Sequence, residues 1–197
     1  MKIAAIDIGS NAARLLINEV KINNKQPEFI KLNLLRIPLR LGMDVFSLGK
    51  IGEEREKMVI DSMKIFSDLM KIYKVEHYRA CATSAMRDAR NIKDIIRKVK
   101  LETGIEIKVI SGQEEASFIY ENHVAENLDS DHSYLYIDVG GGSTELTFFA
   151  GGALVSKESF NIGTIRLLKN QIKEKTWDDM KDYVKKNIKS ALPSIAI

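Results

Sequence analysis

The stretch IDVGGGST (residues 137–144) decides the fold of this chain, because a shorter version of it, IDIGSN, stands near the N-terminus at residues 6–11. In both places an apolar segment ends in an aspartate, an apolar residue and a glycine, and small polar residues follow. The two stretches lie about 131 residues apart, a longer period than those of short-repeat proteins. Chance similarity is the alternative to an internal duplication. Two duplicated halves that face each other predict a two-lobed molecule with one site between them.

Hydrophobic periodicity around these stretches indicates an α/β chain. Apolar residues three and four positions apart between Ile51 and Tyr73 predict an amphipathic helix. We expect Asn91 to cap a further helix, with Asp94 three residues on, and Gly104 to end it. Other segments are expected as strands (2–8, 14–20, 28–41, 77–82, 105–110, 134–139, 145–149 and 153–160) or helices (111–124 and 176–191), with a helix as the alternative for 14–20. Strands and helices that alternate predict a mixed α/β layer structure.

The polar segment AENLDSDH (125–132) is the best linker candidate, because the chain restarts with strands after it. We therefore expect a first lobe over residues 1–125, a linker over 126–132 and a second lobe from 133 to 197.

The glycine-rich stretch 138–145 has the composition of a phosphate-binding loop. Three consecutive glycines allow backbone N–H groups to approach an anion, and Ser143 and Thr144 add hydroxyl groups. Asp138 and Glu145 bracket the loop with carboxylates, which suit Mg²⁺. The alternative is a hairpin turn with its carboxylates in solvent, but the related loop at residues 7–11 favours phosphate binding. The stretch is not a P-loop, because no Gly-Lys-Ser/Thr follows it and a strand-like segment does.

The stretch Ser111-Gly112-Gln113-Glu114-Glu115 follows an expected strand and opens an expected helix. Ser111 and Glu114 have the spacing of a capping box, which gives Glu114 a structural role. Glu115 is not needed for the cap. Because α/β proteins place their chemistry at such strand ends, Glu115 is a candidate general base, with a surface glutamate as the alternative.

Arginines supply candidate phosphate ligands, because the planar guanidinium matches phosphate oxygens. Arg87 follows the small residues ATSAM (82–86), and its alternative is a surface ion pair with Asp88 or Glu102. Arg36 and Arg40 could also reach an anion, although ordinary surface positions are the alternative for both.

Composition excludes several classes. The chain has 197 residues, 45% hydrophobic and 29% charged, and no apolar run near the about 20 residues that a membrane span needs. We expect no signal peptide, because the first residues run directly into a strand. A single cysteine, Cys81, excludes an internal disulfide and is compatible with the cytoplasm, where we expect the protein. Three scattered histidines argue against zinc, and a net charge of +3 without a base-stacking motif gives no support for nucleic-acid binding.

Five motifs together resemble the exopolyphosphatase / guanosine pentaphosphate phosphohydrolase family of the actin-like, sugar-kinase and Hsp70 superfamily. They occur in the order and at the spacing of that family, and they span almost the whole chain. The motifs are IDIGSNAARLLI (6–17), ATSAMRDARN (82–91), ISGQEEA (110–116), IDVGGGSTEL (137–146) and IGTIRL (162–167).

The resemblance implies a ribonuclease-H-like (actin-like ATPase) fold, with a mixed sheet flanked by helices in two lobes and a Mg²⁺-dependent phosphate site in the cleft. It implies that Glu115 activates water and that Arg87 holds phosphate. It also implies metal and phosphate contacts from the two aspartate loops: Asp138, Glu145 and Asp7 for the metal, and Gly9, Ser10, Asn11, Gly141, Gly142 and Ser143 for phosphate. Arg36 is our further phosphate candidate.

The chain departs from the family pattern in two respects. Ala12 stands where family members usually have serine, so one hydroxyl contact is absent. Family members also continue well past the region of Pro193, so we expect an incomplete second lobe with an uncovered sheet edge. A homodimer, or a C-terminal part beyond these residues, is expected to cover it.

The hypothesis that follows is a Mg²⁺-dependent phosphoanhydride hydrolase. It would release terminal phosphate from inorganic polyphosphate, the favoured substrate, or convert guanosine pentaphosphate to the tetraphosphate. Two alternatives stay open at this point: a non-catalytic module that binds polyphosphate or guanosine phosphates, and a sugar-kinase-like phosphotransferase.

Overall fold

The structure, a computed structural model, describes residues 1–23, 26–123 and 131–191. The chain forms two compact units, Met1–Ile110 and Ser111–Ile197. The predicted lobe boundary at residue 125 stays a prediction, because most of the predicted linker lies outside the described residues. No helix in the described ranges is both long and apolar enough to span a membrane.

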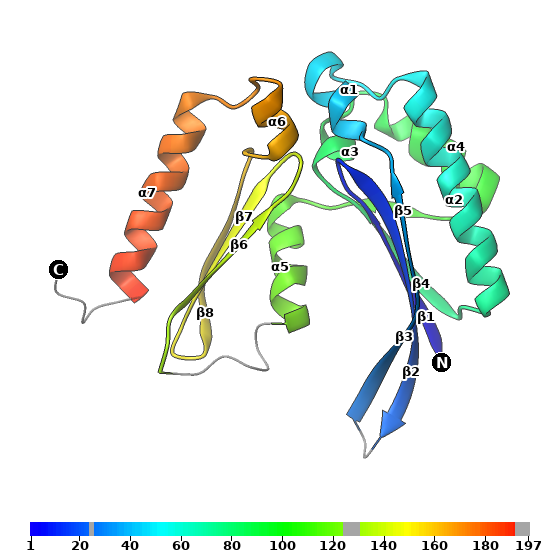
Figure 1. The fold of residues 1–197 in the computed structure, drawn as a ribbon, viewed down its shortest axis with the longest axis horizontal. Coiled ribbons are helices and arrows are strands. Elements are labelled where there is room, and N and C mark those ends of the chain that lie inside the picture. Colours follow the sequence, from blue (N-terminus) through cyan, green and yellow to red (C-terminus); the bar gives the residue numbers. More distant parts are fainter. Residues whose placement is uncertain (24–25, 124–130, 192–197) are drawn as a thin grey trace. The chain divides into compact units, whose positions relative to one another are not determined.

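The first unit is built on a five-stranded mixed sheet (Figure 1). Its strands are β1 (Lys2–Ile8), β2 (Ala12–Asn23), β3 (Gln26–Pro38), β4 (His77–Ala82) and β5 (Ile107–Val109), in the order β3-β2-β1-β4-β5. The strand β1 runs antiparallel to β2 and parallel to β4. Four helices belong to this unit: α1 (Leu41–Leu48), α2 (Glu53–Tyr73), α3 (Ser84–Asp88) and α4 (Ile92–Thr103).

The helix α2 follows the predicted apolar stripe. Val59, Met63 and Phe66 are fully buried on one side of it, as the spacing of three and four residues requires. It packs against α4, and the two helices lie together beside the sheet (Figure 1). Gly104 ends α4 in the left-handed conformation (φ 73°), as predicted.

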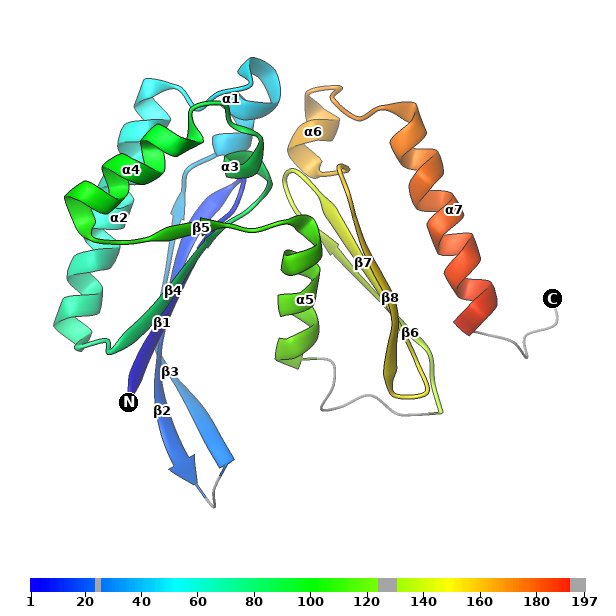
Figure 2. The same ribbon diagram turned by 180° about the vertical axis from the view of Figure 1, so that it is seen from behind.

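The second unit is a three-stranded antiparallel sheet between two helices (Figures 1 and 2). Its elements are α5 (Gly112–His123), β6 (Tyr134–Val139), β7 (Thr144–Ala150), β8 (Ala153–Phe160), α6 (Thr164–Leu168) and α7 (Glu174–Ala191). The central strand β7 is buried along nearly its whole length, because α5 covers one face of the sheet and α7 the other. The strand β6 lies at the end of the sheet order β6-β7-β8, and most of its residues are exposed.

The predicted duplication extends to the backbone. Each copy has three antiparallel strands followed by a short helix and a longer one. The first loop closes with Gly9 N donating to Ala12 O at 3.0 Å, and the second with Gly140 N donating to Ser143 O at 2.8 Å. The chain also returns to each loop in the same way, because Gly42 N donates to Ser10 O and Ile165 N to Gly141 O, both at 2.9 Å.

Three sequence expectations need correction. The strand expected over 28–41 ends at Pro38, and the helix α1 begins at Leu41, because Arg40 adopts a left-handed conformation (φ 54°) that turns the chain. The short helices α3 and α6 were not expected. Asn91 makes no side-chain cap; its amide instead bonds Ile51 N at 3.0 Å and Ile51 O at 2.9 Å, so it holds a loop to α4.

Candidate active site

Three side chains form a row across the sheet of the second unit, and we call Asp138, Glu145 and Ser159 the carboxylate row. Asp138 pairs with Glu145 across β6 and β7, and Glu145 pairs with Ser159 across β7 and β8. Directly paired residues share one face of a sheet, with Cβ atoms about 5 Å apart. The Ser159 hydroxyl donates to Glu145 Oε1 at 2.7 Å. Glu145 is only 3% exposed, so this hydrogen bond offsets part of the cost of burying a carboxylate.

Contacts with α6 and with Gly163, the residue before it, hold the glycine loop between β6 and β7 in place. Arg166 Nε donates to Gly142 O at 2.7 Å. Gly163 lies so close to the loop that a Cβ on it would meet the Gly141 carbonyl and Gly142 N at 2.5 Å. Ser143 is 2% exposed. The loop is therefore a packed, pre-formed turn rather than a loose hairpin.

The first turn of α5 carries Glu115. The predicted capping box is confirmed, because Ser111 N donates to Glu114 Oε2 at 2.9 Å and Glu114 N to Ser111 Oγ at 3.1 Å. The cap uses Glu114 and not Glu115, which is partly buried. Because α5 packs on β7 and β8, Glu115 belongs to the same unit as the carboxylate row.

Asp138 and Glu145 fit a magnesium ion as two adjacent carboxylates. Mg²⁺ keeps several waters and is commonly held through one or two carboxylates together with phosphate oxygens of a substrate. Within the described ranges, no group of three or more His, Cys, Asp or Glu side chains is placed to hold a metal. The donor set therefore fits a hydrated cation that a substrate phosphate helps to bind, and not an all-protein cage.

The first unit has a corresponding row with different side chains, and we call Asp7, Arg14 and Arg36 the arginine row. Asp7 pairs with Arg14 across β1 and β2, and Arg14 pairs with Arg36 across β2 and β3. Arg14 Nη1 donates to Asp7 Oδ2 at 3.0 Å, an ion pair whose side chains are about half exposed. One carboxylate beside two guanidinium groups leaves this row with a net positive charge.

Arg87 lies on α3 and is held by the backbone of its own unit. Its Nη1 donates to Ile110 O at 2.8 Å, and its backbone N–H donates to Thr83 O. Glu102, one of the partners considered for it, pairs with Lys64 at 2.6 Å. Nearby, Ser10 and Ser84 share a buried hydrogen bond of 2.8 Å, which joins the first aspartate loop to α3.

The structure divides the sequence-predicted residues between the two units. The first unit holds Asp7, Gly9, Ser10, Asn11, Arg36 and Arg87, and the second holds Glu115, Asp138, Gly141, Gly142, Ser143 and Glu145. Arg14, Ser159 and Arg166 were not among the residues predicted from the sequence. The duplication carried the signal for Arg14, because it stands seven residues after Asp7, as Glu145 does after Asp138.

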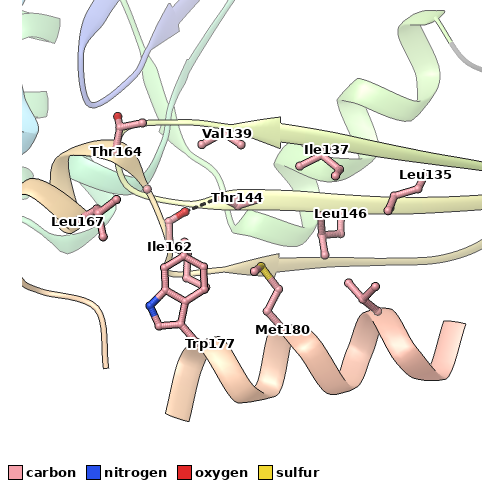
Figure 3. A pocket seen from close by; sticks show the side chains of 12 residues that line it. Leu135, Ile137, Val139, Thr144, Leu146, Ile162, Thr164, Leu167, Trp177 and Met180 are labelled. Atoms are coloured by element: carbon pink, nitrogen blue, oxygen red, sulfur yellow. Dashed lines mark hydrogen bonds between the residues drawn. The ribbon is translucent and has the colours of Figure 1, made fainter. Parts of the chain in front are cut away.

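A cavity of about 340 Å³ lies on the opposite face of the second sheet (Figure 3). Leu135, Ile137 and Val139 line it from β6, and Trp177 and Met180 line it from α7. The lining contains no charged side chain, so this cavity does not suit a phosphate or a metal ion.

Comparison with known proteins fits this geometry. The model of the Ppx/GppA phosphatase family matches residues 22–194. The chain belongs to the Ppx/GppA phosphatase family. An exopolyphosphatase of Cytophaga hutchinsonii shares its fold, with a TM-score of 0.78 and 29% identity over 98% of this chain and 64% of that one. The expected α/β fold, with a mixed sheet flanked by helices, is thereby confirmed.

Two curated relatives are also similar to this member of the Ppx/GppA family. A bifunctional 3-dehydroquinate synthase/phosphatase of Fusobacterium nucleatum is 36% identical over 94% of this chain and 30% of its own length. A guanosine-5'-triphosphate,3'-diphosphate pyrophosphatase of Vibrio vulnificus is 30% identical over 87% of this chain and 34% of its own length. The chain thus spans about a third of these two relatives.

Proposed function

We propose that this Ppx/GppA chain hydrolyses terminal phosphoanhydride bonds of inorganic polyphosphate, with Glu115 as general base and Mg²⁺ at the carboxylate row. Family membership, the pre-formed glycine loop and the two adjacent carboxylates support the proposal. A phosphoryl-transfer site needs charge and positioning more than a covalent nucleophile, so a site without cysteine or histidine is adequate.

One observation carries the proposal: the first turn of α5 lies directly against the carboxylate row. Gly112, three residues before Glu115, approaches Ser159 so closely that a Cβ on it would lie 2.5 Å from Ser159 Oγ. Ser159 in turn bonds Glu145. The candidate base and the two carboxylates are therefore built on neighbouring elements of one unit.

In the proposed reaction, Glu115 accepts a proton from a water molecule whose oxygen attacks the terminal phosphorus. The new P–O bond forms as the anhydride P–O bond breaks, and the shortened polyphosphate leaves with the bonding electron pair. Backbone N–H groups of the glycine loop stabilise the charge on the terminal phosphoryl oxygens. A Mg²⁺ ion held by Asp138 and Glu145 would neutralise negative charge on the phosphate chain.

The test measures phosphate release from polyphosphate with Mg²⁺ for the wild type, Glu115→Gln and Glu114→Gln. Loss of a general base costs about 10²- to 10⁴-fold, so Glu115→Gln should lose at least about 100-fold in kcat. Glu114→Gln is the matched control, because glutamine also serves at this position of a capping box, and its rate should stay close to wild type.

The result that contradicts the proposal is tight polyphosphate binding without phosphate release by the wild type. That result would favour the binding module considered above, and phosphate transfer to an added sugar would favour a kinase.

Guanosine pentaphosphate is the second candidate substrate, because the Vibrio vulnificus relative is named for that class of nucleotide. The same assay on both substrates separates them by kcat/KM. The cytoplasmic location, the roles of Arg87 and Arg36 and a homodimer stay predictions.

A further inference from the structure

Ser159 hydrogen-bonds the buried carboxylate of the site. Its hydroxyl donates to Glu145 Oε1 at 2.7 Å, and the two residues are direct partners across β7 and β8. Glu145 is almost fully buried, so its orientation depends on such a contact and not on bulk water.

The position of Ser159 depends on Gly112 at the start of α5. A Cβ on Gly112 would lie 2.5 Å from Ser159 Oγ and 2.7 Å from Ser159 Cβ, well inside van der Waals contact. With any side chain at position 112, the Ser159 hydroxyl could not stay where it hydrogen-bonds Glu145. Farther along the same two elements, Lys157 of β8 donates to the Ser117 hydroxyl of α5, so the helix is held to the strand at a second point.

We infer that Ser159 is a positioning residue that orients Glu145 for a divalent cation. Gly112 is required because its lack of a side chain leaves space for the Ser159 hydroxyl. The inference rests on the proposed function, because it takes Glu145 as a metal carboxylate. Outer hydrogen-bond partners of metal ligands typically contribute about 10- to 100-fold to metal affinity, although they never touch the ion.

The experiment titrates Mn²⁺ alone, as a paramagnetic substitute for Mg²⁺, into the 197-residue chain and follows bound Mn²⁺ by electron paramagnetic resonance. Ser159→Ala should weaken Mn²⁺ binding by about 10- to 100-fold. Ser156→Ala is the matched control on the same strand. Its hydroxyl bonds Tyr183 of α7, on the other face of the sheet, and its removal should leave Mn²⁺ affinity within about twofold of wild type.

Gly112→Ala provides a second, steric approach. It should weaken Mn²⁺ binding as Ser159→Ala does and also lower the melting temperature, because the new methyl group collides with Ser159. Adding Ser159→Gly to Gly112→Ala removes both colliding atoms. The double variant should recover its melting temperature but not its Mn²⁺ affinity, a separation that a purely structural role would not produce.

Each outcome has a distinct meaning. Wild-type affinity in Ser159→Ala overturns the inference and leaves the metal assignment intact. An equal loss of affinity in Ser156→Ala also overturns it, because the effect would then be general loosening of β8. Absence of Mn²⁺ binding by the wild type, both with Mn²⁺ alone and with added inorganic phosphate, overturns the metal assignment of the proposed function, and this inference with it.

Discussion

The carboxylate row of the second unit and the arginine row of the first occupy corresponding places on duplicated backbones, yet they carry opposite charge. Asp138 faces Glu145, whereas Asp7 faces Arg14 and is ion-paired with it. Two carboxylates side by side favour a cation, and two guanidinium groups favour an anion such as phosphate. The turns and strand registers match, so the two copies share a backbone arrangement, while the side chains of the two rows differ in charge.

The rows also differ in burial. The Asp7–Arg14 pair is about half exposed, and exposed pairs contribute little to stability, about 0 to 1 kcal/mol. Glu145 is buried and depends on Ser159. The comparison therefore predicts that substitutions in the second unit lower stability and metal affinity. Equivalent substitutions in the first unit should change both only slightly.

The largest effect is expected where α6 meets the glycine loop. Gly163→Ala places a methyl group 2.5 Å from backbone atoms of Gly141 and Gly142, which cannot move aside as a flexible side chain would. We expect a loss of about 3 kcal/mol in the free energy of unfolding, measured by urea denaturation. Gly163 itself has an extended backbone (φ −148°), so the requirement is for space and not for conformation.

The corresponding position of the first unit, Arg40, provides the control. Its backbone is left-handed (φ 54°), a conformation that glycine adopts without strain. Arg40→Gly is therefore expected to change the free energy of unfolding by less than about 1 kcal/mol. Similar losses in Gly163→Ala and Arg40→Gly would contradict this account of the two loops.

The next prediction compares substitutions of the two aspartates, Asp138 and Asp7. Asp138→Asn should weaken Mn²⁺ binding by about tenfold or more, because it removes one of two adjacent carboxylates. Asp7→Asn should change it by less than about threefold, because Arg14 already neutralises that carboxylate. The same titration by electron paramagnetic resonance measures both, and equal losses would show that Asp7 is a metal ligand as the sequence analysis expected.

The smallest effect concerns the helix behind the carboxylate row. Tyr183 of α7 packs edge-on against Phe148 and Phe160 and hydrogen-bonds Ser156. Burial raises the pKa of the Tyr183 phenol above its ordinary value of 10.0. The folded state then keeps its proton above pH 10 while the unfolded state loses it, so this stabilisation is complete below pH 10 and is lost as the pH rises further.

Tyr183→Phe should cost about 1 kcal/mol at neutral pH, the contribution of one hydrogen bond, and should flatten the decline of stability above pH 10. Urea denaturation of both proteins at a series of pH values checks this. An identical decline in the variant would mean that Tyr183 does not titrate as burial implies.

Much of the fold could be predicted from the sequence, because its signals are local. Periodicity predicted α2, and the Ser111–Glu114 spacing predicted the cap of α5. The hairpin turn that was considered as the alternative for the glycine loop is present, since the loop joins the antiparallel strands β6 and β7. The helix α1 was missed because its start depends on a left-handed arginine, which no propensity indicates. Asn91 was misassigned because a loop distant in sequence competes for its amide.

Single candidate residues of the site could be found in the sequence. Their arrangement in rows across the two sheets could not. Asp138, Glu145 and Asp7 could be found as carboxylates beside glycines. Arg14 was missed although its spacing from Asp7 equals that of Glu145 from Asp138. Ser159 could not be placed beside Glu145, because its role depends on strand register and on the close approach of Gly112. Such contacts arise from tertiary packing and leave no local signature.

The position of β6 at the end of its sheet bears on how the chain behaves in concentrated solution. In the part of the chain that the structure describes, this strand has a neighbour on one side only, and Ile137 and Val139 are more than half exposed. Its sequence, YLYIDV, has neither the proline nor the lysine that commonly prevents edge-to-edge association. The strand is thus a template for aggregation, and solubility should depend on whatever covers it.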